Sequence, residues 1–172
     1  LFRSPLSSSC GRLFDAVSAL LGICLSCTYE GQGAIELGDL VPWLESNNVG
    51  YWLKDFSPYP FDIIDDVINP QRTVLALINE IKKGVPKKDI ARRFHDTVVQ
   101  IIVQGVHRVS INTGIKKVVL SGGSWQNRYL SLLTKHFLEQ MGYRVYCHRR
   151  VPTNDGGLSL GQAMVGYWRW KE

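Results

Sequence analysis

The sequence has few cysteines and no long hydrophobic run. No apolar stretch approaches the ~20 residues of a membrane helix, because Gly22, Asp39 and Gln104 interrupt the longest candidates. Four cysteines in 172 residues are too few for a disulfide scaffold, and we expect no signal peptide. We therefore expect no membrane span and a protein of the reducing cytoplasm.

Extremes of charge and composition are also lacking. Lys and Arg total 20 against 15 Asp and Glu, a formal net charge of +5, and 45% of the residues are hydrophobic. These proportions predict a globular chain with a buried core and exclude overall disorder. No stripe of Lys and Arg with interleaved aromatics is present, so no nucleic-acid partner is expected, whereas an anionic ligand such as a nucleotide fits.

No metal motif is complete in the sequence. The four histidines show neither HExxH nor HxxxH spacing. Cys24 and Cys27 form one CxxC motif, but a structural zinc site needs four ligands and a redox motif needs a thioredoxin-like context. We interpret these cysteines as buried or incidental, and His95 and His107 as ordinary residues of a long helix.

The length of the chain suits one domain, or one lobe of a larger one. We expect a single domain over residues 1–172. The chain begins at Leu1 rather than Met, and its first ten residues already approach a helix. We therefore expect it to be part of a longer protein.

Hydrophobic periodicity predicts helices in the first two thirds of the chain. A first helix follows the hydroxyls of residues 7–9 and ends near Gly22, and a second covers 35–44 with a distortion at Pro42. Short strands are predicted at 51–56 and 61–64. Two further helices are predicted at about 71–83 and 87–113, the second ending at Gly114.

The last third has the pattern of a βαβ unit. An apolar strand at 116–120 leads into a glycine turn, then a helix with apolar residues from Tyr129 to Leu138, and a strand at 144–147. A final helix covers 156–170. Strand, helix and strand in this order imply a right-handed parallel pair.

The glycine turn is the strongest chemical signal. Gly122 and Gly123 follow a buried strand, so the backbone can approach a ligand, and the next helix directs its free N–H groups toward a phosphate. Gly-Gly alone also fits a plain βα turn, because neither a Walker A motif nor a dinucleotide fingerprint is present. Asn127, a carboxamide one turn into that helix, favours contact with a ribose or a base edge.

Three carboxylates are further candidates. Asp155 follows a strand and precedes two glycines, a position that suits a metal ligand and equally the cap of the next helix. Asp15 lies on an otherwise apolar helix, where a dipole partner is the simpler interpretation. Glu36, like Glu30, flanks a loop with two glycines and could be only solvated. The residues themselves leave these alternatives open.

Four blocks together resemble a known family. Residues 4–17 (SPLSSSCGRLFDAV), 29–31 (YEG), 120–127 (LSGGSWQN) and 152–162 (PTNDGGLSLGQ) occur in this order over nearly the whole chain. They resemble the C-terminal part of the HypF family of hydrogenase-maturation carbamoyltransferases. More distantly they are similar to transferases of tRNA threonylcarbamoyladenosine formation, which tend to have Asp-Asn-Gly where this sequence has Asn154-Asp155-Gly156-Gly157, and to antibiotic O-carbamoyltransferases.

The resemblance implies an α/β fold of the ASKHA class (actin/Hsp70-like, RNase H-like), in which two lobes clasp a nucleotide. This chain would be the second lobe of a Kae1-like domain, with βαβ units and flanking helices. Asp155 matches a ligand of a divalent metal (Mg, Zn or Fe), whose family partners are two histidines of an upstream HxxxH motif absent from this sequence. By motif match, the implied contacts of ATP are Asp15, Gly31, Gln32, Glu36, Gly122, Gly123 and Asn127.

The activity implied by the resemblance is carbamoyl transfer. The whole protein would convert carbamoyl phosphate and ATP into carbamoyl-adenylate and pass the carbamoyl group to the C-terminal cysteine of a partner, HypE, for nickel–iron hydrogenase maturation. This chain would supply half of the nucleotide site and be inactive alone. Two alternatives stay open, namely threonylcarbamoyl transfer to tRNA and a non-catalytic ATP-binding ASKHA module.

Overall fold

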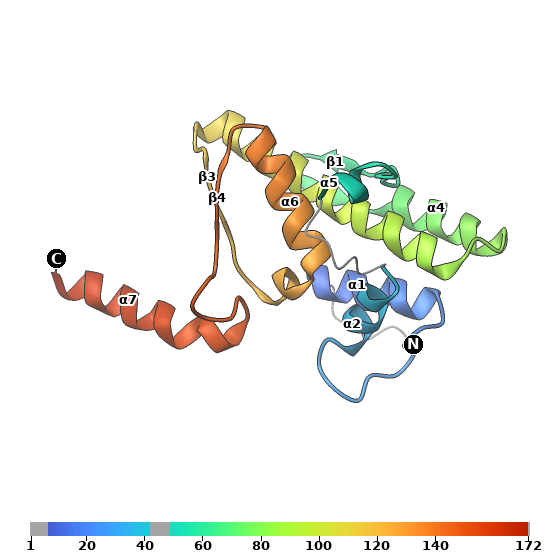
Figure 1. Cartoon of the computed structure of the whole chain (residues 1–172), viewed down its shortest axis with the longest axis horizontal. Helices are drawn as coiled ribbons and strands as arrows, with labels where there is room; N and C mark the ends of the chain where they lie inside the picture. The colour runs from blue at the N-terminus through green and yellow to red at the C-terminus, as the bar shows by residue number, and fades with distance from the viewer. Residues whose placement is uncertain (1–6, 42–48, 172) are drawn as a thin grey trace. The chain divides into compact units, whose positions relative to one another are not determined.

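The computed structural model describes residues 7–41 and 49–171. Helices and short strands follow one another in a mixed α/β order (Figure 1). The chain divides into two compact units, residues 1–101 and 102–172. Each unit is described by itself below.

Two helices open the first unit. α1 (Cys10–Leu20) begins after Ser9 and is followed by Gly22 at φ +61°, as predicted. α2 (Gln32–Asp39) begins earlier than expected, directly after Gly31, whose φ of +79° favours glycine. It also ends earlier, so the predicted helix over 35–44 was placed too far along the chain. Pro42 and the residues up to 48 lie outside the described residues.

The strand predicted at 51–56 is wrong. Val49–Leu53 instead form the single helical turn α3, which buries Trp52 to 5% exposure. Aromatic residues favour a strand only where neighbouring strands offer packing partners. Among residues 7–41 and 49–171, no strand pairs with this segment.

The strand predicted at 61–64 is confirmed as one arm of a hairpin. β1 (Asp62–Ile64) pairs antiparallel with β2 (Val67–Asn69). The two connecting residues, Asp65 and Asp66, both have positive φ, at 48° and 63°. This is the two-residue turn whose twist matches that of paired strands, and aspartate tolerates it.

Two longer helices come next, as predicted, and the second extends beyond residue 101 into the second unit. α4 (Gln71–Lys82) and α5 (Lys87–Thr113) follow the hairpin, and Gly114 ends α5 with φ +72°. In the core, the Phe14 ring meets Phe94 edge to face at 4.9 Å between centroids. No helix in the described part of the chain has the length and apolar character of a membrane span.

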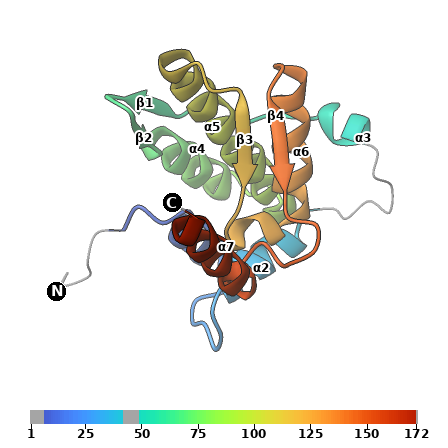
Figure 2. The ribbon, with the colours of Figure 1, turned by 90° about the vertical axis from the view of Figure 1, so that its left-hand side faces the viewer.

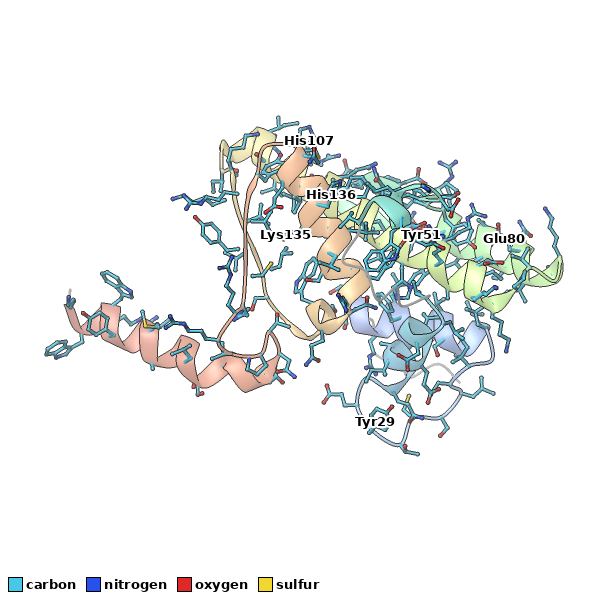
Figure 3. All side chains as sticks on the ribbon, in the orientation of Figure 1. Tyr29, Tyr51, Glu80, His107, Lys135 and His136 are labelled. Atoms are coloured by element: carbon cyan, nitrogen blue, oxygen red, sulfur yellow. The ribbon has the colours of Figure 1, made fainter. Side chains whose placement is uncertain are left out.

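A charged cluster holds the segment before the hairpin against α4 and α5. The Tyr59 hydroxyl donates to Glu80 of α4, and Glu80, which is labelled in Figure 3, also pairs with Arg93 of α5. The Arg93 guanidinium lies 4.2 Å from the centre of the Tyr59 ring. Burial, helped by Glu80, raises the pKa of Tyr59 above its usual value. The phenol therefore stays protonated and remains a hydrogen-bond donor.

The second unit contains the predicted parallel pair. β3 (Lys117–Leu120) and β4 (Arg144–Cys147) pair in parallel with Leu120 opposite Cys147. α6 (Arg128–Gln140) connects them and lies against one face of the pair (Figure 2). After β4, a short 3-10 turn, η2 (Asp155–Gly157), leads into the last helix, α7 (Leu158–Lys171). The predicted βαβ order is confirmed.

Candidate functional site

The loops that leave β3 and β4 are tied together. The Gly122 amide donates to the Thr153 carbonyl over 2.8 Å, and the Thr153 hydroxyl donates to the Gly122 carbonyl over 3.2 Å. The carboxyl ends of neighbouring parallel strands meet at one edge of a sheet, which is where α/β proteins bind ligands. The glycine turn and the Asp155 loop, far apart in sequence, therefore share this edge.

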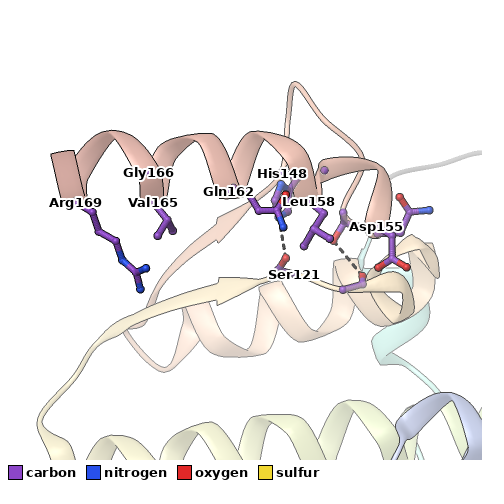
Figure 4. A pocket seen from close by; sticks show the side chains of 13 residues that line it. Ser121, His148, Asp155, Leu158, Gln162, Val165, Gly166 and Arg169 are labelled. Atoms are coloured by element: carbon purple, nitrogen blue, oxygen red, sulfur yellow. Dashed lines mark hydrogen bonds between the residues drawn. The ribbon is translucent and has the colours of Figure 1, made fainter.

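A cavity of about 670 Å³ opens beside these two loops (Figure 4). Its volume lies in the range of small-molecule sites. Gly122 has φ +110°, and a Cβ at Gly122 or Gly123 would meet no atom within 4 Å, so the backbone of the turn faces open space. Asp155, His148 and, from α7, Arg169 are the titratable side chains that line the cavity.

His148 is a site residue that the sequence reasoning missed. Its Nε2 lies 3.0 Å from the Ser121 hydroxyl oxygen, and both residues line the cavity (Figure 4). Each residue directly follows the last residue of its strand. That position was a usable signal, because polar residues after parallel strands gather at the ligand-binding edge.

Asn127 has a different local role from the one expected. A short 3-10 turn, η1 (Gly123–Gln126), separates the glycines from α6, so Asn127 precedes the helix instead of lying one turn inside it. Its side-chain oxygen caps α6 by accepting from the Leu130 amide over 3.1 Å. The turn closes early because the Trp125 amide donates to the Gly122 carbonyl. Nucleotide contact by Asn127 stays a prediction.

Asp155 is not the cap of the turn it begins. Asn154 fills that role, since its side-chain oxygen accepts from the Gly156 amide over 3.1 Å. The Asp155 side chain is exposed at the cavity. Glycine is required at position 157, because a Cβ there would lie 2.6 Å from the Pro152 carbonyl oxygen.

The described residues do not assemble a metal centre by themselves. No group of three His, Cys, Asp or Glu side chains close enough to hold a cation occurs within 7–41 and 49–171. Asp155 is the one carboxylate on the cavity lining. A metal at this point would therefore need ligands beyond these residues.

In the first unit, Asp15 carries an unsatisfied carboxylate oxygen. Asp15 lies in the middle of α1, outside its first turn, so a helix-dipole role is not supported. Its Oδ2 pairs with Arg12 at 2.8 Å. Its Oδ1 is buried and accepts no hydrogen bond from the described residues. A Cβ at Gly33 would come within 2.9 Å of this oxygen, so glycine keeps the space beside it free.

The start of α2 holds a chain of side-chain hydrogen bonds. The Gln32 side-chain oxygen accepts from the Thr28 amide at 2.7 Å and from its hydroxyl at 3.1 Å. The Gln32 amide nitrogen donates to Glu36 Oε1 at 2.7 Å. Gln32 and Glu36 are thus fixed on one face of α2 next to Gly31, whereas Tyr29 lies exposed on the preceding loop (Figure 3).

Asp15 and the α2 residues belong to the first unit, and the glycine turn, Asn127 and Asp155 belong to the second. In the first unit Gln32 bonds to Glu36, and in the second Gly122 and Asp155 line one cavity. A parallel strand–helix–strand unit with a glycine turn and an aspartate at its strand ends is typical of α/β ligand-binding domains and agrees with the predicted ASKHA fold class. A family model described as "Carbamoyltransferase, Kae1-like Domain, second subdomain" matches residues 1–162. The chain belongs to this HypF family of carbamoyltransferases.

Known relatives agree with this assignment. Carbamoyltransferase HypF of Rhodobacter capsulatus is 35% identical over 165 residues, covering 95% of this chain and 20% of the relative. That of Synechocystis sp. is 30% identical, with the same two shares of 95% and 20%. A crystal structure of full-length HypF in the phosphate- and nucleotide-bound form is 40% identical with a TM-score of 0.81, over 92% of this chain and 20% of that one. The chain spans about a fifth of the length of these relatives.

Proposed function

We propose that this chain takes part in carbamoyl transfer through an adenylate. Carbamoyl phosphate and ATP are the substrates, carbamoyl-adenylate is the intermediate, and the C-terminal cysteine thiol of a HypE-type protein is the acceptor. The observation that carries the proposal is the cavity that joins the glycine turn to Asp155. The nucleotide-bound form of a HypF relative supports ATP as the ligand class.

The phosphates of ATP are assigned to the second unit. Gly122 and Gly123 present backbone without side chains, and such backbone allows the close approach of a phosphate. Arg169 lines the same cavity and adds a positive charge. We assign the side-chain NH2 group of Asn127 to a contact with the nucleoside. The side-chain oxygen of Asn127 caps α6.

The first unit offers hydrogen-bond acceptors of the kind that a ribose requires. A buried carboxylate oxygen without a partner is costly, and a ribose hydroxyl is a donor of the right kind to satisfy it. Oδ1 of Asp15 is such an oxygen. Glu36 provides a second acceptor, and Gly31 and Gln32 border the same hydroxyls with their backbone. The contact between Gln32 and Glu36 orients that acceptor.

The reaction depends mainly on the correct positioning of its reactants. A carbamoyl group joined to AMP in a mixed anhydride is already an activated acyl donor, and the acceptor protein supplies the thiol. This chain then needs no nucleophile of its own, and its backbone N–H groups stabilise charge that develops during transfer. Asp155 is the proposed ligand of a divalent cation completed by other residues. We place this reaction in the cytoplasm, with no nucleic acid and no membrane involved.

Replacement of Asp155 by asparagine tests the proposal. In a HypF protein that contains this chain, Asp155→Asn should abolish carbamoyl phosphate-dependent formation of AMP from ATP, because a hard cation requires the carboxylate charge. The melting temperature should not change, since Asn154 provides the cap. Asp65→Asn is the matched control, because Asp65 is exposed in the hairpin turn and asparagine tolerates its φ of 48°. Full AMP formation by Asp155→Asn would refute the assignment.

A further inference from the structure

The CxxC motif holds two sulfur atoms in contact. Sγ of Cys24 lies 3.6 Å from Sγ of Cys27, and both cysteines are free thiols. The sulfurs of a disulfide are about 2.0 Å apart. Only a short movement is needed to close the remaining gap, because the two sulfurs already lie in contact. These cysteines were interpreted as buried or incidental; Cys24 is buried, and the contact between the two sulfurs was not anticipated.

The two thiols differ in access. Cys24 is 8% exposed, and its Sγ donates to the Ser26 carbonyl over 3.6 Å, whereas Cys27 is exposed. Burial, with smaller contributions from Cys27 and Glu36, raises the pKa of the Cys24 thiol. An external reagent therefore reaches Cys27 first, and Cys24 reacts second from inside.

We propose that Cys24 and Cys27 are a reversible thiol–disulfide site that reacts with low-molecular-weight disulfides. The Cys27 thiolate attacks one sulfur of such a disulfide, forming a mixed disulfide and releasing one small thiol. Cys24 then loses its proton and attacks the Cys27 sulfur, which forms the internal disulfide and releases the second small thiol. Two protein thiols are oxidised, and one external disulfide is reduced to two thiols.

The position of the pair gives its oxidation a structural consequence. Cys27 directly precedes Thr28, whose amide donates to the Gln32 side chain at the start of α2. Closing the four-residue ring moves the backbone next to this hydrogen bond. Oxidation should therefore change the hydrogen exchange of the Thr28 amide, a readout that does not depend on the proposed function.

Tryptic peptides separate this pair from the other two cysteines. Cleavage after Arg12 and Lys54 gives peptide 13–54, which contains Cys24 and Cys27, while Cys10 and Cys147 fall in other peptides. The chain is equilibrated with oxidised and reduced glutathione and then quenched with an alkylating reagent in denaturant. After tryptic digestion, the masses of the peptides are measured by mass spectrometry. Peptide 13–54 should lose both alkylatable thiols together and weigh two hydrogen masses less, without glutathione, and dithiothreitol should restore both thiols.

Single substitutions provide the controls. Cys147→Ser should leave closure of the pair unchanged, and Cys27→Ser should abolish it. Because Cys27 is exposed, its replacement should not disturb folding. The proposal is overturned if peptide 13–54 keeps two free thiols under conditions that glutathionylate Cys147. Stable glutathione adducts on peptide 13–54 in place of the internal disulfide would overturn it as well.

Discussion

At the scale of single residues, the environment of His95 fixes its protonation state. The ring is fully buried beside Phe14 at 5.1 Å between centroids. Its Nδ1 lies 2.7 Å from the Ala91 carbonyl, which only accepts, so Nδ1 carries the proton. Burial lowers the pKa of His95 to about 4. The expectation of an ordinary helix residue is therefore confirmed, and His95 is a neutral core residue at pH 7.

His95 should make the stability of the chain depend on pH. Its folded pKa is about 4 against 6.5 for an unperturbed histidine, so between these values the unfolded state binds more protons. The free energy of unfolding should then fall as pH drops from 6.5 to 4, by on the order of 3 kcal/mol in total. Urea unfolding of the chain and of His95→Gln at pH 7 and 4.5 measures this term. Equal losses in both proteins would contradict it.

Asn127 should affect both stability and nucleotide binding. Asn127→Ala removes the cap of α6, at a cost of about 1 kcal/mol, and should weaken ATP binding by on the order of 1–2 kcal/mol. Asn127→Ser is the matched control, because serine is also a good cap but lacks the amide donor. Thermal melting should therefore distinguish alanine from serine, while ATP titration should show the same loss for both. Unchanged ATP affinity in both variants would remove Asn127 from the site.

At the scale of elements, the sequence pattern predicted the helices and strands whose formation depends mainly on their own residues. The apolar periodicity of α4, α5 and α6 and the β-branched run of β3 contain enough signal to predict these elements. The strand prediction for residues 51–56 is wrong because their aromatic composition is typical of a strand. The burial of Trp52 in a helical turn is instead a tertiary effect. The caps of η2 and α6 also depend on backbone geometry at Asn154 and Asn127 that composition does not reveal.

The turn before α7 should tolerate no side chain at Gly157. A Cβ there would lie 2.6 Å from the Pro152 carbonyl oxygen, which is backbone and cannot easily move. Gly157→Ala should lower the free energy of unfolding by about 1–3 kcal/mol. Gly105→Ala on α5 is the control, since its Cβ would meet nothing within 4 Å. It should be neutral or stabilising by up to about 1 kcal/mol. Equal stability of both variants would contradict the close approach in this turn.

At the scale of the whole molecule, the family and the fold class followed from motifs, whereas most of the site's geometry did not. The blocks around Asp15, the glycine turn and Asp155 are contiguous in sequence, so the chain alone indicates them. The fold brings Gly122 to Thr153 and Ser121 to His148, which are far apart in the sequence. It also buries the unsatisfied carboxylate oxygen of Asp15. Spacing along the sequence cannot predict such contacts.

The most direct measurement is a titration of the ¹⁵N-labelled chain with ATP, followed by amide NMR. If this chain supplies only half of the nucleotide site, here called the half-site, the phosphates of ATP stay in water. Charge interactions are several-fold weaker there than in a closed pocket. The chain should therefore bind ATP more weakly than micromolar, with the largest shifts at the amides of Gly122 and Gly123, and these shifts should shrink in Asn127→Ser. Micromolar affinity would contradict the half-site, and the absence of shifts at the glycine turn under excess ATP would contradict the nucleotide site itself.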